Sequence, residues 1–253
     1  MSDFKEWLIK YELLEVSNNI YKYAEELGSI PREEVQRWLL MRNETDPKKD
    51  SFGDYKQRRT FTALFGWSVP CKEAVDAIKK YVREPLYDIM AGTGYWGRVL
   101  RKAGIRVLTS DIHNQRQKNY YHQTNGDNDA MFDPPFKVSP EKSKIRRRNS
   151  IRIGHDMNKG RIKGDIFLSW PPYQSSAATQ VLRMIPIGTR VFYIGEPEGG
   201  CTGDLSLCRM LDKNFKELHF EPLPRFSGIH DHLYIYEKTK DDELDKIGIK
   251  NEI

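Results

Sequence analysis

Two short segments of the chain combine residue types that could hold a nucleoside and a flat substrate. In the first, Asp88–Gly97, an apolar run is followed by a turn that contains Gly92 and Gly94. Glycine there lets the backbone bend sharply and approach a ligand closely. Asp111 ends the next apolar run, roughly twenty residues past the loop, where a carboxylate can accept hydrogen bonds from ribose hydroxyls. A plain tight turn with a helix-capping Asp111 is the structural alternative.

The loop departs from the fingerprint of dinucleotide-binding proteins. Met90 stands where the first glycine of that fingerprint would fall, and Asp88 lies at the end of the strand-like run. An acidic residue before the loop suits an amino-acid ammonium better than a pyrophosphate. No Gly-Lys-Ser/Thr sequence follows, which argues against a triphosphate. These features predict S-adenosylmethionine (SAM) as the ligand.

The second segment is the sequence Ser-Trp-Pro-Pro-Tyr at Ser169–Tyr173, directly after an apolar run. Prolines fix φ and lack an N–H donor, so they can leave neighbouring carbonyls rigidly available to an amino group. Tyr173 offers a face for stacking or for a developing positive charge. The alternative is a strand end followed by a turn. A similar sequence, Asp133–Phe136, comes too soon after Asp111 for another strand and helix, and we interpret it as a turn in an insertion.

In this order, Asp88–Gly97, Asp111 and Ser169–Tyr173 resemble the motifs of class I SAM-dependent methyltransferases. Ser169–Tyr173 resembles the [DNS]-P-P-[YFW] motif of enzymes that methylate an exocyclic or amide nitrogen. The inserted Trp170 is a departure, which leaves Ser169 and Trp170 both as candidates for the polar position. A narrower resemblance, over residues 66–237, is to a group of uncharacterised methyltransferase-like proteins. It is carried by Gly66–Pro70, Ala91–Trp96, Ser169–Tyr173, Tyr193–Glu196, Gly199–Asp204, Ile229–Asp231 and Leu233–Tyr234.

The resemblance implies a role for each matching residue. The loop and Asp88 would hold the methionine end of SAM, Asp111 the ribose, and Ile112 and Asp156 the adenine. The implied cofactor-binding set is Asp88, Met90, Ala91, Gly92, Gly94, Tyr95, Trp96, Asp111, Ile112 and Asp156. The residues that would face the substrate are Ser169, Trp170, Pro171, Pro172 and Tyr173.

Two acidic residues, Glu196 and Asp204, follow the apolar run over 191–194. Glu196 or Asp204 could position a substrate, but a glycine-rich loop with Asp204 as a helix N-cap explains them equally well. A turn is the favoured interpretation of His230 and Asp231 over a catalytic dyad. No cluster of His, Cys and carboxylates demands a metal, and no base is identifiable for a nucleophilic Cys201.

The elements that would position these residues alternate between strand and helix. Strands are predicted over 86–90, 107–110, 151–153, 166–170 and 191–194, with helices over 95–103, 176–184 and 205–211. This alternation predicts an α/β, Rossmann-like, mostly parallel sheet. Two runs, 218–220 and 233–236, lack an intervening helix and predict an antiparallel C-terminal edge.

The chain divides into an N-terminal helical extension (1–67), a Rossmann-like methyltransferase domain (68–237) and a charged tail (238–253). In the extension, one helix should end near Gly28 and a second should begin at Pro31, followed by a loop over 43–58.

Composition excludes several classes of protein. The 253 residues are 38 % apolar and 30 % charged, with a formal net charge of +5, which is typical of a globular protein. Three cysteines without metal-ligand spacing exclude a disulfide scaffold and a zinc ribbon. No apolar run suits a secretory signal or a membrane span, so we expect a cytoplasmic location, or a nuclear one in a eukaryote.

Two basic runs, Lys142–Arg152 and Lys56–Arg59, could neutralise phosphates, although such runs are usually solvated loops. With the aromatic side chains, they favour a nitrogen of a DNA or RNA base as the methyl acceptor. A small molecule or a protein side chain is an alternative acceptor. A catalytically inactive SAM- or RNA-binding subunit is a third alternative, and the N-terminal helices could bind a partner protein.

Overall fold

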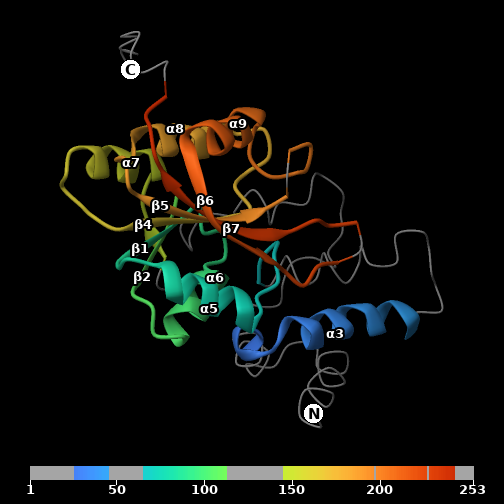
Figure 1. Ribbon diagram of the computed structural model, residues 1–253. Coiled ribbons are helices and arrows are strands. Elements are labelled where there is room, and N and C mark those ends of the chain that lie inside the picture. Colours follow the sequence, from blue (N-terminus) through green and yellow to red (C-terminus); the bar gives the residue numbers. More distant parts are fainter. Residues whose placement is uncertain (1–25, 46–64, 113–144, 197, 227, 243–253) are drawn as a thin grey trace, which may run out of the picture.

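Seven strands form one mixed sheet in the order β3-β2-β1-β4-β5-β7-β6 (Figure 1). This computed structural model describes residues 26–45, 65–112, 145–196, 198–226 and 228–242. The strands are β1 (Leu86–Ile89), β2 (Val107–Asp111), β3 (Arg146–Arg147), β4 (Asp165–Ser169), β5 (Arg190–Gly195), β6 (Phe215–Pro222) and β7 (His232–Lys238). Strands β1 to β5 pair in parallel, whereas β7 runs antiparallel to both β5 and β6. The predicted Rossmann-like sheet with an antiparallel C-terminal edge is confirmed.

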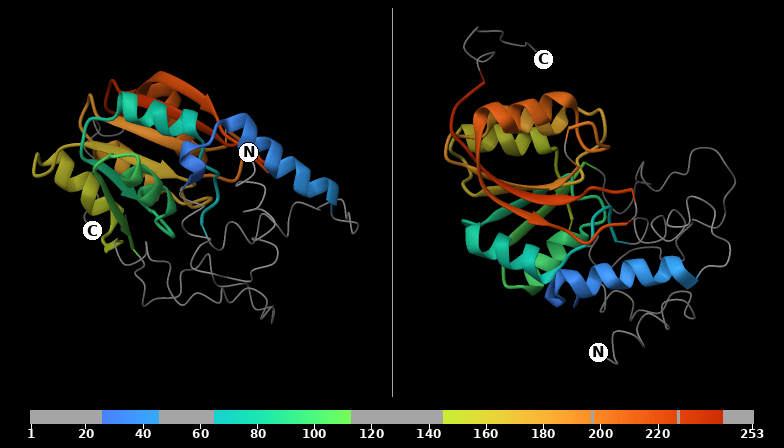
Figure 2. Two further views of the ribbon diagram at one scale, coloured as in Figure 1. Left: turned by 90° about the horizontal axis from the view of Figure 1, so that it is seen from below. Right: turned by 45° about the vertical axis from the view of Figure 1, so that its right-hand side comes forward.

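Helices cover both faces of the sheet (Figures 1 and 2). Helices α7, α8 and α9 lie on one face, and α5 and α6 lie on the other, with α3 beyond them. They are η1 (Leu27–Ser29, a 3₁₀ turn), α3 (Arg32–Thr45), α5 (Lys72–Tyr81), α6 (Tyr95–Lys102), α7 (Ser150–Asn158), α8 (Ala177–Met184) and α9 (Leu205–Asn214). Within the described ranges, no helix is both long enough and apolar enough to cross a membrane.

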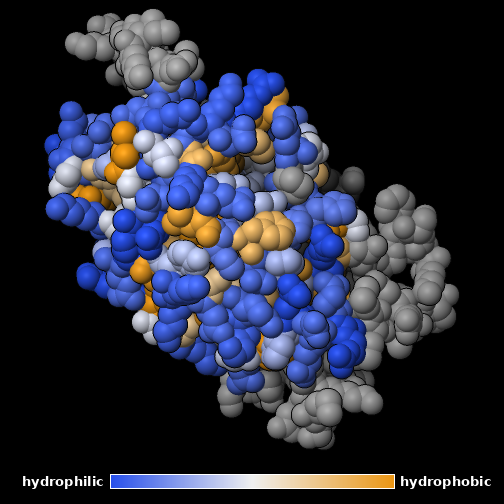
Figure 3. Space-filling view, in the orientation of Figure 1, coloured by the Kyte–Doolittle hydropathy of each residue, from blue (hydrophilic) through white to orange (hydrophobic). Residues whose placement is uncertain are grey.

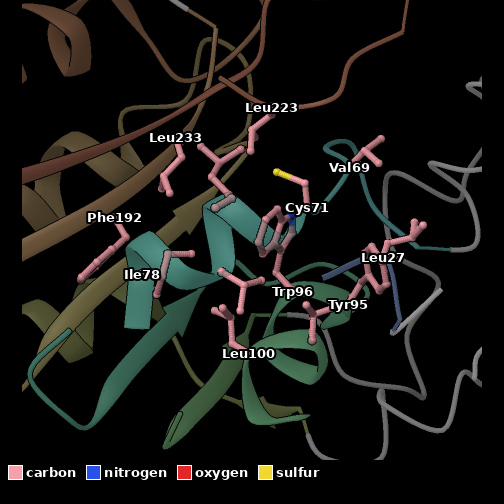
Figure 4. Packing of buried hydrophobic residues seen from close by; sticks show 14 of the residues in the cluster. Leu27, Val69, Cys71, Ile78, Tyr95, Trp96, Leu100, Phe192, Leu223 and Leu233 are labelled. Atoms are coloured by element: carbon pink, nitrogen blue, oxygen red, sulfur yellow. The ribbon is translucent and has the colours of Figure 1, made fainter. Parts of the chain in front are cut away.

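Each face of the sheet has its own apolar core, because side chains alternate along a strand. Leu86 packs toward α5 and α6, whereas Tyr87 and Ile89 pack toward α7, α8 and α9. Figure 4 shows the first core, in which Trp96 lies among aliphatic side chains from the helices and the sheet. On the outer surface seen in Figure 3, apolar residues form separate patches between hydrophilic ones.

The described part of the N-terminal extension joins this first core. Leu27 and Val35 are fully buried in it, and a Cβ on Gly28 would lie 2.5 Å from Cγ1 of Val99 on α6. The predicted helix at Pro31 is present as α3, which continues to Thr45 and therefore past the predicted start of the loop. The predicted helix before Gly28 lies mostly outside the described residues.

Helix α3 is also bound to the chain between β6 and β7. The Gln36 side chain donates to the carbonyl of Arg225 at 3.0 Å and accepts from the N–H of Arg225 at 2.8 Å. Arg32 and Glu221 form an ion pair at 3.4 Å. These contacts hold α3 against the antiparallel edge of the sheet.

One predicted strand is wrong. Residues 151–153 belong to helix α7, and the third parallel strand is the two-residue β3 just before it. Asn149 is the N-cap, and its side chain accepts a hydrogen bond from the N–H of Ile151. Ile153 and Met157 then lie four residues apart on the buried face. The cap and this helical spacing override the β-propensity of the two isoleucines.

Candidate active site at the carboxyl edge of the sheet

The segments that follow β1, β2, β4 and β5 meet at one edge of the sheet. Ile89 at the end of β1 pairs with Ser110 of β2, and Ser169 at the end of β4 pairs with Ile194 of β5. Because these strands are parallel, their carboxyl ends face the edge where ligands bind in open α/β sheets. The structure therefore brings together the glycine loop, Asp111 and the Ser-Trp-Pro-Pro-Tyr segment.

Backbone conformation distinguishes the same edge. Among described residues other than glycine, only Met90, Trp170 and Gln174 have positive φ, at 56°, 51° and 57°. This conformation costs a residue with a side chain roughly 1–2 kcal/mol. Such residues cluster at ligand-binding and active sites. Met90 thus adopts a left-handed backbone conformation that favours glycine, although it carries a side chain.

The glycine loop is bound directly to the acidic residue that ends β2. The N–H of Gly92 donates to Oδ2 of Asp111 at 2.9 Å, and the N–H of Ala91 donates to the carbonyl of Ser110 at 3.1 Å. Asp111 is 7 % exposed, and its neighbour Ile112 is 54 % exposed. A carboxylate can accept about four hydrogen bonds, so the bond to Gly92 is compatible with others to ribose hydroxyls.

Helix α6 begins where the loop ends. Gly94 is its N-cap with φ of 77°, a left-handed conformation that glycine adopts without strain. The side chains of Tyr95 and Trp96 are buried, in ring contact with Phe65 and Phe167 respectively. Any contact that these two residues make with a cofactor would therefore use the backbone at the start of α6.

Asp88 lies beneath α6. A Cβ on Gly97 would lie 2.6 Å from Oδ2 of Asp88 and 2.3 Å from Oγ1 of Thr109, closer than a side chain fits without a shift of these two residues. Oδ2 of Asp88 is buried and has no hydrogen-bond partner among the described residues. Burial raises the pKa of Asp88 to about 7, although Arg101 and Thr109 act in the opposite direction. The carboxyl group lies against Gly97 of α6. Its contact with a methionine ammonium stays a prediction.

A crossing segment (Phe65–Ser68) passes over the carboxyl edge before α5 begins. The hydroxyl of Thr93 in the glycine loop donates to the carbonyl of Phe65. In the sequence, Gly66–Pro70 form part of the narrower resemblance and lie at the boundary predicted before residue 68. Neither their composition nor their spacing indicates that they lie against the loop, so their contribution was missed.

Ser68 connects the glycine loop side of the site to the Ser-Trp-Pro-Pro-Tyr segment. Nε1 of Trp96 donates to Oγ of Ser68 at 2.8 Å, and Oγ of Ser68 lies 2.9 Å from Oγ of Ser169. Ser68 is fully buried. The Ser169 hydroxyl, one candidate for the polar position that faces a substrate, is thus held by a residue from outside the motif.

Trp170, the other candidate, is held on two sides. Its indole stacks on that of Trp67 with ring centroids 5.3 Å apart, and its Nε1 donates to Oδ1 of Asp231 at 2.8 Å. Its backbone N–H donates to the carbonyl of Ile194 at 2.8 Å. Asp231 is therefore a partner of the motif, a role that the sequence did not indicate. The backbone N–H of the neighbouring His230 donates to Oε1 of Glu196 at 3.1 Å.

The rest of the motif joins the glycine-rich segment after β5. The carbonyls of Pro171 and Pro172 accept from the N–H groups of Gly203 and Ser175, at 2.9 and 3.2 Å. Two of the carbonyls predicted to be available are therefore used within the fold. Tyr173, in contrast, is 58 % exposed, so its ring is accessible to a substrate.

Glu196 and Asp204 both have structural partners. Oε2 of Glu196 accepts from the N–H of Cys201 at 2.7 Å, and Oε1 accepts from the N–H of His230 at 3.1 Å. Oδ1 of Asp204 accepts from the N–H of Leu207 and from the hydroxyl of Thr179. These contacts favour the alternative interpretation, a capped loop, over a substrate contact.

Asp156, to which the resemblance assigns an adenine contact, lies within helix α7 and not after a strand. Its carboxylate accepts hydrogen bonds from Arg148 at 2.6 Å and from Arg161 at 3.2 Å. Burial opposes ionisation, but the hydrogen bonds from these two arginines hold the pKa of Asp156 below its usual value. These contacts make Asp156 part of a cluster of charges, and we do not retain the adenine contact.

Other sequence features lie outside the described residues, namely Asp133–Phe136, Lys56–Arg59 and the start of the basic run that ends at Arg152. In the part of the chain that the structure describes, no three His, Cys, Asp or Glu side chains gather as metal ligands would. Cys201 is exposed and its thiol is free.

No protein-family model and no curated protein matches the chain. Among solved structures, it is similar to the magnesium protoporphyrin IX methyltransferase of Synechocystis PCC 6803 with bound SAM. The identity is 12 % over 88 % of this chain and 99 % of that one, with a TM-score of 0.40. It is also similar to the N-methyltransferase NodS of Bradyrhizobium japonicum WM9 in complex with S-adenosylhomocysteine, at 9 % identity over 82 % and 99 %, with a TM-score of 0.37.

A third similar structure is 1,6-didemethyltoxoflavin-N1-methyltransferase of Burkholderia thailandensis. The identity is 13 % over 74 % of this chain and 84 % of that chain, with a TM-score of 0.40. At these scores the likeness carries no argument about activity. The fold assignment rests on the strand order and pairing of this chain.

Proposed function

We propose that this protein is a SAM-dependent methyltransferase that methylates a nitrogen of a nucleic-acid base. The observation that carries the first part is the hydrogen bond between Gly92 and Asp111. It places a tight glycine turn and a carboxylate side by side at the carboxyl edge, where a Rossmann-like sheet binds a nucleoside. The exposed Ile112 beside them offers an apolar surface for an adenine ring.

The donor set fits the proposed cofactor. Asp111 can accept from ribose hydroxyls, and the backbone N–H groups at the start of α6 favour a negatively charged group such as the methionine carboxylate. When bound, SAM supplies a methyl group that its sulfonium has already activated. The protein then has to align donor and acceptor and keep water out, which requires no metal and no nucleophilic side chain.

For the acceptor, we place a planar base against Tyr173. Its exposed ring follows two prolines whose fixed backbone holds it in position. Stacking on such a ring would orient the ring nitrogen or amino group toward the glycine loop, and the tyrosine face would stabilise positive charge on the acceptor nitrogen. The methylated nitrogen can lose its proton to bulk water late, after the methyl group has been transferred.

The contacts of the Ser-Trp-Pro-Pro-Tyr segment also favour one alternative, a protein that binds SAM without transferring a methyl group. The Ser169 hydroxyl, the Trp170 indole N–H and the carbonyls of Pro171 and Pro172 all have partners within the fold. A protein that binds SAM without transferring a methyl group, as a subunit of a complex, would have no need for free acceptors there. A methyltransferase for a small molecule or a protein side chain is the remaining alternative.

Calorimetric titration with SAM and with S-adenosylhomocysteine tests the cofactor site. We expect micromolar dissociation constants that rise at least about tenfold in Asp111→Ala, because one charge-assisted contact contributes ~1.5–3 kcal/mol. Asp212→Ala, an exposed aspartate on α9, is the matched control and should bind as the unchanged protein does. If neither compound binds, the methyltransferase proposal is wrong.

Transfer of a labelled methyl group from SAM then separates the acceptor classes. We expect label in DNA or RNA, released as a methylated base on nuclease digestion. Label only in small molecules or only in protein would support the second acceptor class. SAM binding without transfer to nucleic acid, protein or cell extract would support the inactive subunit.

A further inference from the structure

The positive charge of the protein is concentrated in one described segment. Residues 145–163 contain seven Lys or Arg and one carboxylate, a net charge of +6, whereas the whole chain carries +5. The one carboxylate, Asp156, is buried and bound by Arg148 and Arg161. The remaining cations are exposed and form what we call the β3–α7 surface: Arg146, Arg147, Arg152, Lys159 and Lys163.

This surface begins beside the proposed cofactor site. Arg147 of β3 pairs in register with Asp111, and the N–H of Arg148 donates to the carbonyl of Asp111 at 2.9 Å. Arg152 on α7 and Lys159, the C-cap of this helix, lie seven residues apart, on the side opposite to the face that packs against the sheet and α8. The basic residues therefore run from the carboxyl edge along the outer side of α7, which Figures 1 and 2 show at the rim of the molecule.

We propose that the β3–α7 surface binds the phosphate backbone of the nucleic acid whose base enters the site. The proposal rests on the proposed function for its base acceptor. Arginine matches phosphate with paired N–H donors, and a row of such side chains follows a backbone without reading its sequence. Binding there would hold the strand while a neighbouring base reaches Tyr173.

Two other roles explain the β3–α7 surface less completely. They are protection of a sheet edge and binding to a membrane. Charged residues on an edge strand discourage pairing with another sheet, which explains Arg146 and Arg147 but not the side chains on and after α7. A membrane-binding helix would show exposed large apolar side chains next to its cations. Residues 145–163, all described, contain no exposed large hydrophobic side chain.

The test is binding of fluorescent single-stranded DNA and RNA of ~20 nucleotides across a salt series, since affinity for phosphates falls with salt. The variant is Arg146→Gln/Arg147→Gln/Arg152→Gln. Losing three phosphate contacts should reduce the slope of log K against log salt by about 2, and should weaken binding at least about tenfold at ~0.1 M salt. The SAM dissociation constant should not change.

The matched control is Lys79→Gln/Lys102→Gln/Lys213→Gln, which removes three exposed charges from α5, α6 and α9. It should keep the salt slope of the unchanged protein. Equal weakening in both variants would show that only net charge matters and would overturn the proposal. Absence of nucleic-acid binding by the unchanged protein would overturn it too, as would binding to phosphatidylserine vesicles in place of nucleic acid.

One further variant and the measurement of SAM binding separate this proposal from the proposed function. Arg152→Gln alone, on the exposed side of α7, should reduce the salt slope by ~0.7 even if the substitutions in β3 disturb the fold. Nucleic-acid binding that depends on these arginines, in a protein that does not bind SAM, would refute the proposed methyltransferase and leave this surface supported. If the protein binds SAM but the salt slope does not depend on these arginines, the proposed cofactor site is supported and the role of the β3–α7 surface is refuted.

Discussion

The hydroxyl oxygens of Ser68 and Ser169 lie 2.9 Å apart, although 101 residues separate them in sequence. Ser68 also accepts from the indole of Trp96 in the first turn of α6. One buried hydroxyl therefore connects the helix that follows the glycine loop to the end of β4. The two halves of the proposed site, for cofactor and for substrate, share this atom.

Removing the Ser68 hydroxyl should destabilise the folded protein and show whether Ser68 and Ser169 interact. Ser68→Ala leaves Nε1 of Trp96 buried without its acceptor, which should lower the free energy of unfolding by about 1–3 kcal/mol. In urea denaturation, the double variant with Ser169→Ala should cost less than the two single variants added together, by ~0.5 kcal/mol or more. Strict additivity would mean that the two hydroxyls do not interact.

A methyl group at residue 97 should be poorly tolerated. In Gly97→Ala the new Cβ would lie 2.3 Å from Oγ1 of Thr109 and 2.6 Å from Oδ2 of Asp88, so these buried side chains must shift. We expect a loss of about 1–3 kcal/mol in the free energy of unfolding. In Gly66→Ala, the control, the nearest atom to the Cβ is Cδ1 of Tyr95 at 3.8 Å. That variant should differ from the unchanged protein by less than ~0.5 kcal/mol.

Asp88 should make stability depend on pH. Its pKa, raised by burial to about 7, exceeds the ordinary aspartate value of 3.8, so the folded state keeps a proton that the unfolded state loses between these values. Its contribution to stability is therefore complete below about pH 4 and is lost as the pH rises toward 7. Asp88→Asn cannot ionise, so its stability relative to the unchanged protein should increase over this range, by at most ~1.4 kcal/mol per pH unit. Urea denaturation at several pH values measures the difference; a constant difference would contradict the raised pKa.

Tyr173 should affect turnover without affecting cofactor binding. Tyr173→Ala removes the exposed ring that we assign to the acceptor, and we expect methyl transfer to fall below detection while SAM affinity is unchanged. Tyr173→Phe keeps the ring face and should retain most of the activity if stacking is its role. Parallel loss of transfer and of SAM affinity in the alanine variant would place Tyr173 in the cofactor site instead.

The sequence was sufficient for every strand of the sheet except β3 and for most of its helices, because their apolar spacing is local. The helix predicted over 95–103 ends where Gly104 adopts a φ of 89°. The predicted edge strands pair antiparallel as β6 and β7. The one wrong strand lies at Ile151 and Ile153, where two β-branched residues favour a strand locally but Asn149 caps the start of a helix.

The candidate site was less predictable, because its contacts join distant segments. Gly92 lies in the loop after β1 and Asp111 ends the neighbouring strand β2, so their proximity followed from strand order. The bond between Trp170 and Asp231 depends on how the chain after β6 folds back over the edge, which no local pattern indicates. The same holds for the stacking of Trp170 on Trp67.

The burial of Leu27 and Val35 in the same core as α5 and α6 has a practical consequence for anyone who shortens the chain. A fragment that begins at residue 68 would uncover Val75 and Val99, which approach Gly28, and would remove Trp67 from the face of Trp170. Such a fragment should aggregate or unfold even though every strand of the sheet is present. The smallest fragment worth expressing for assays therefore begins before Leu27.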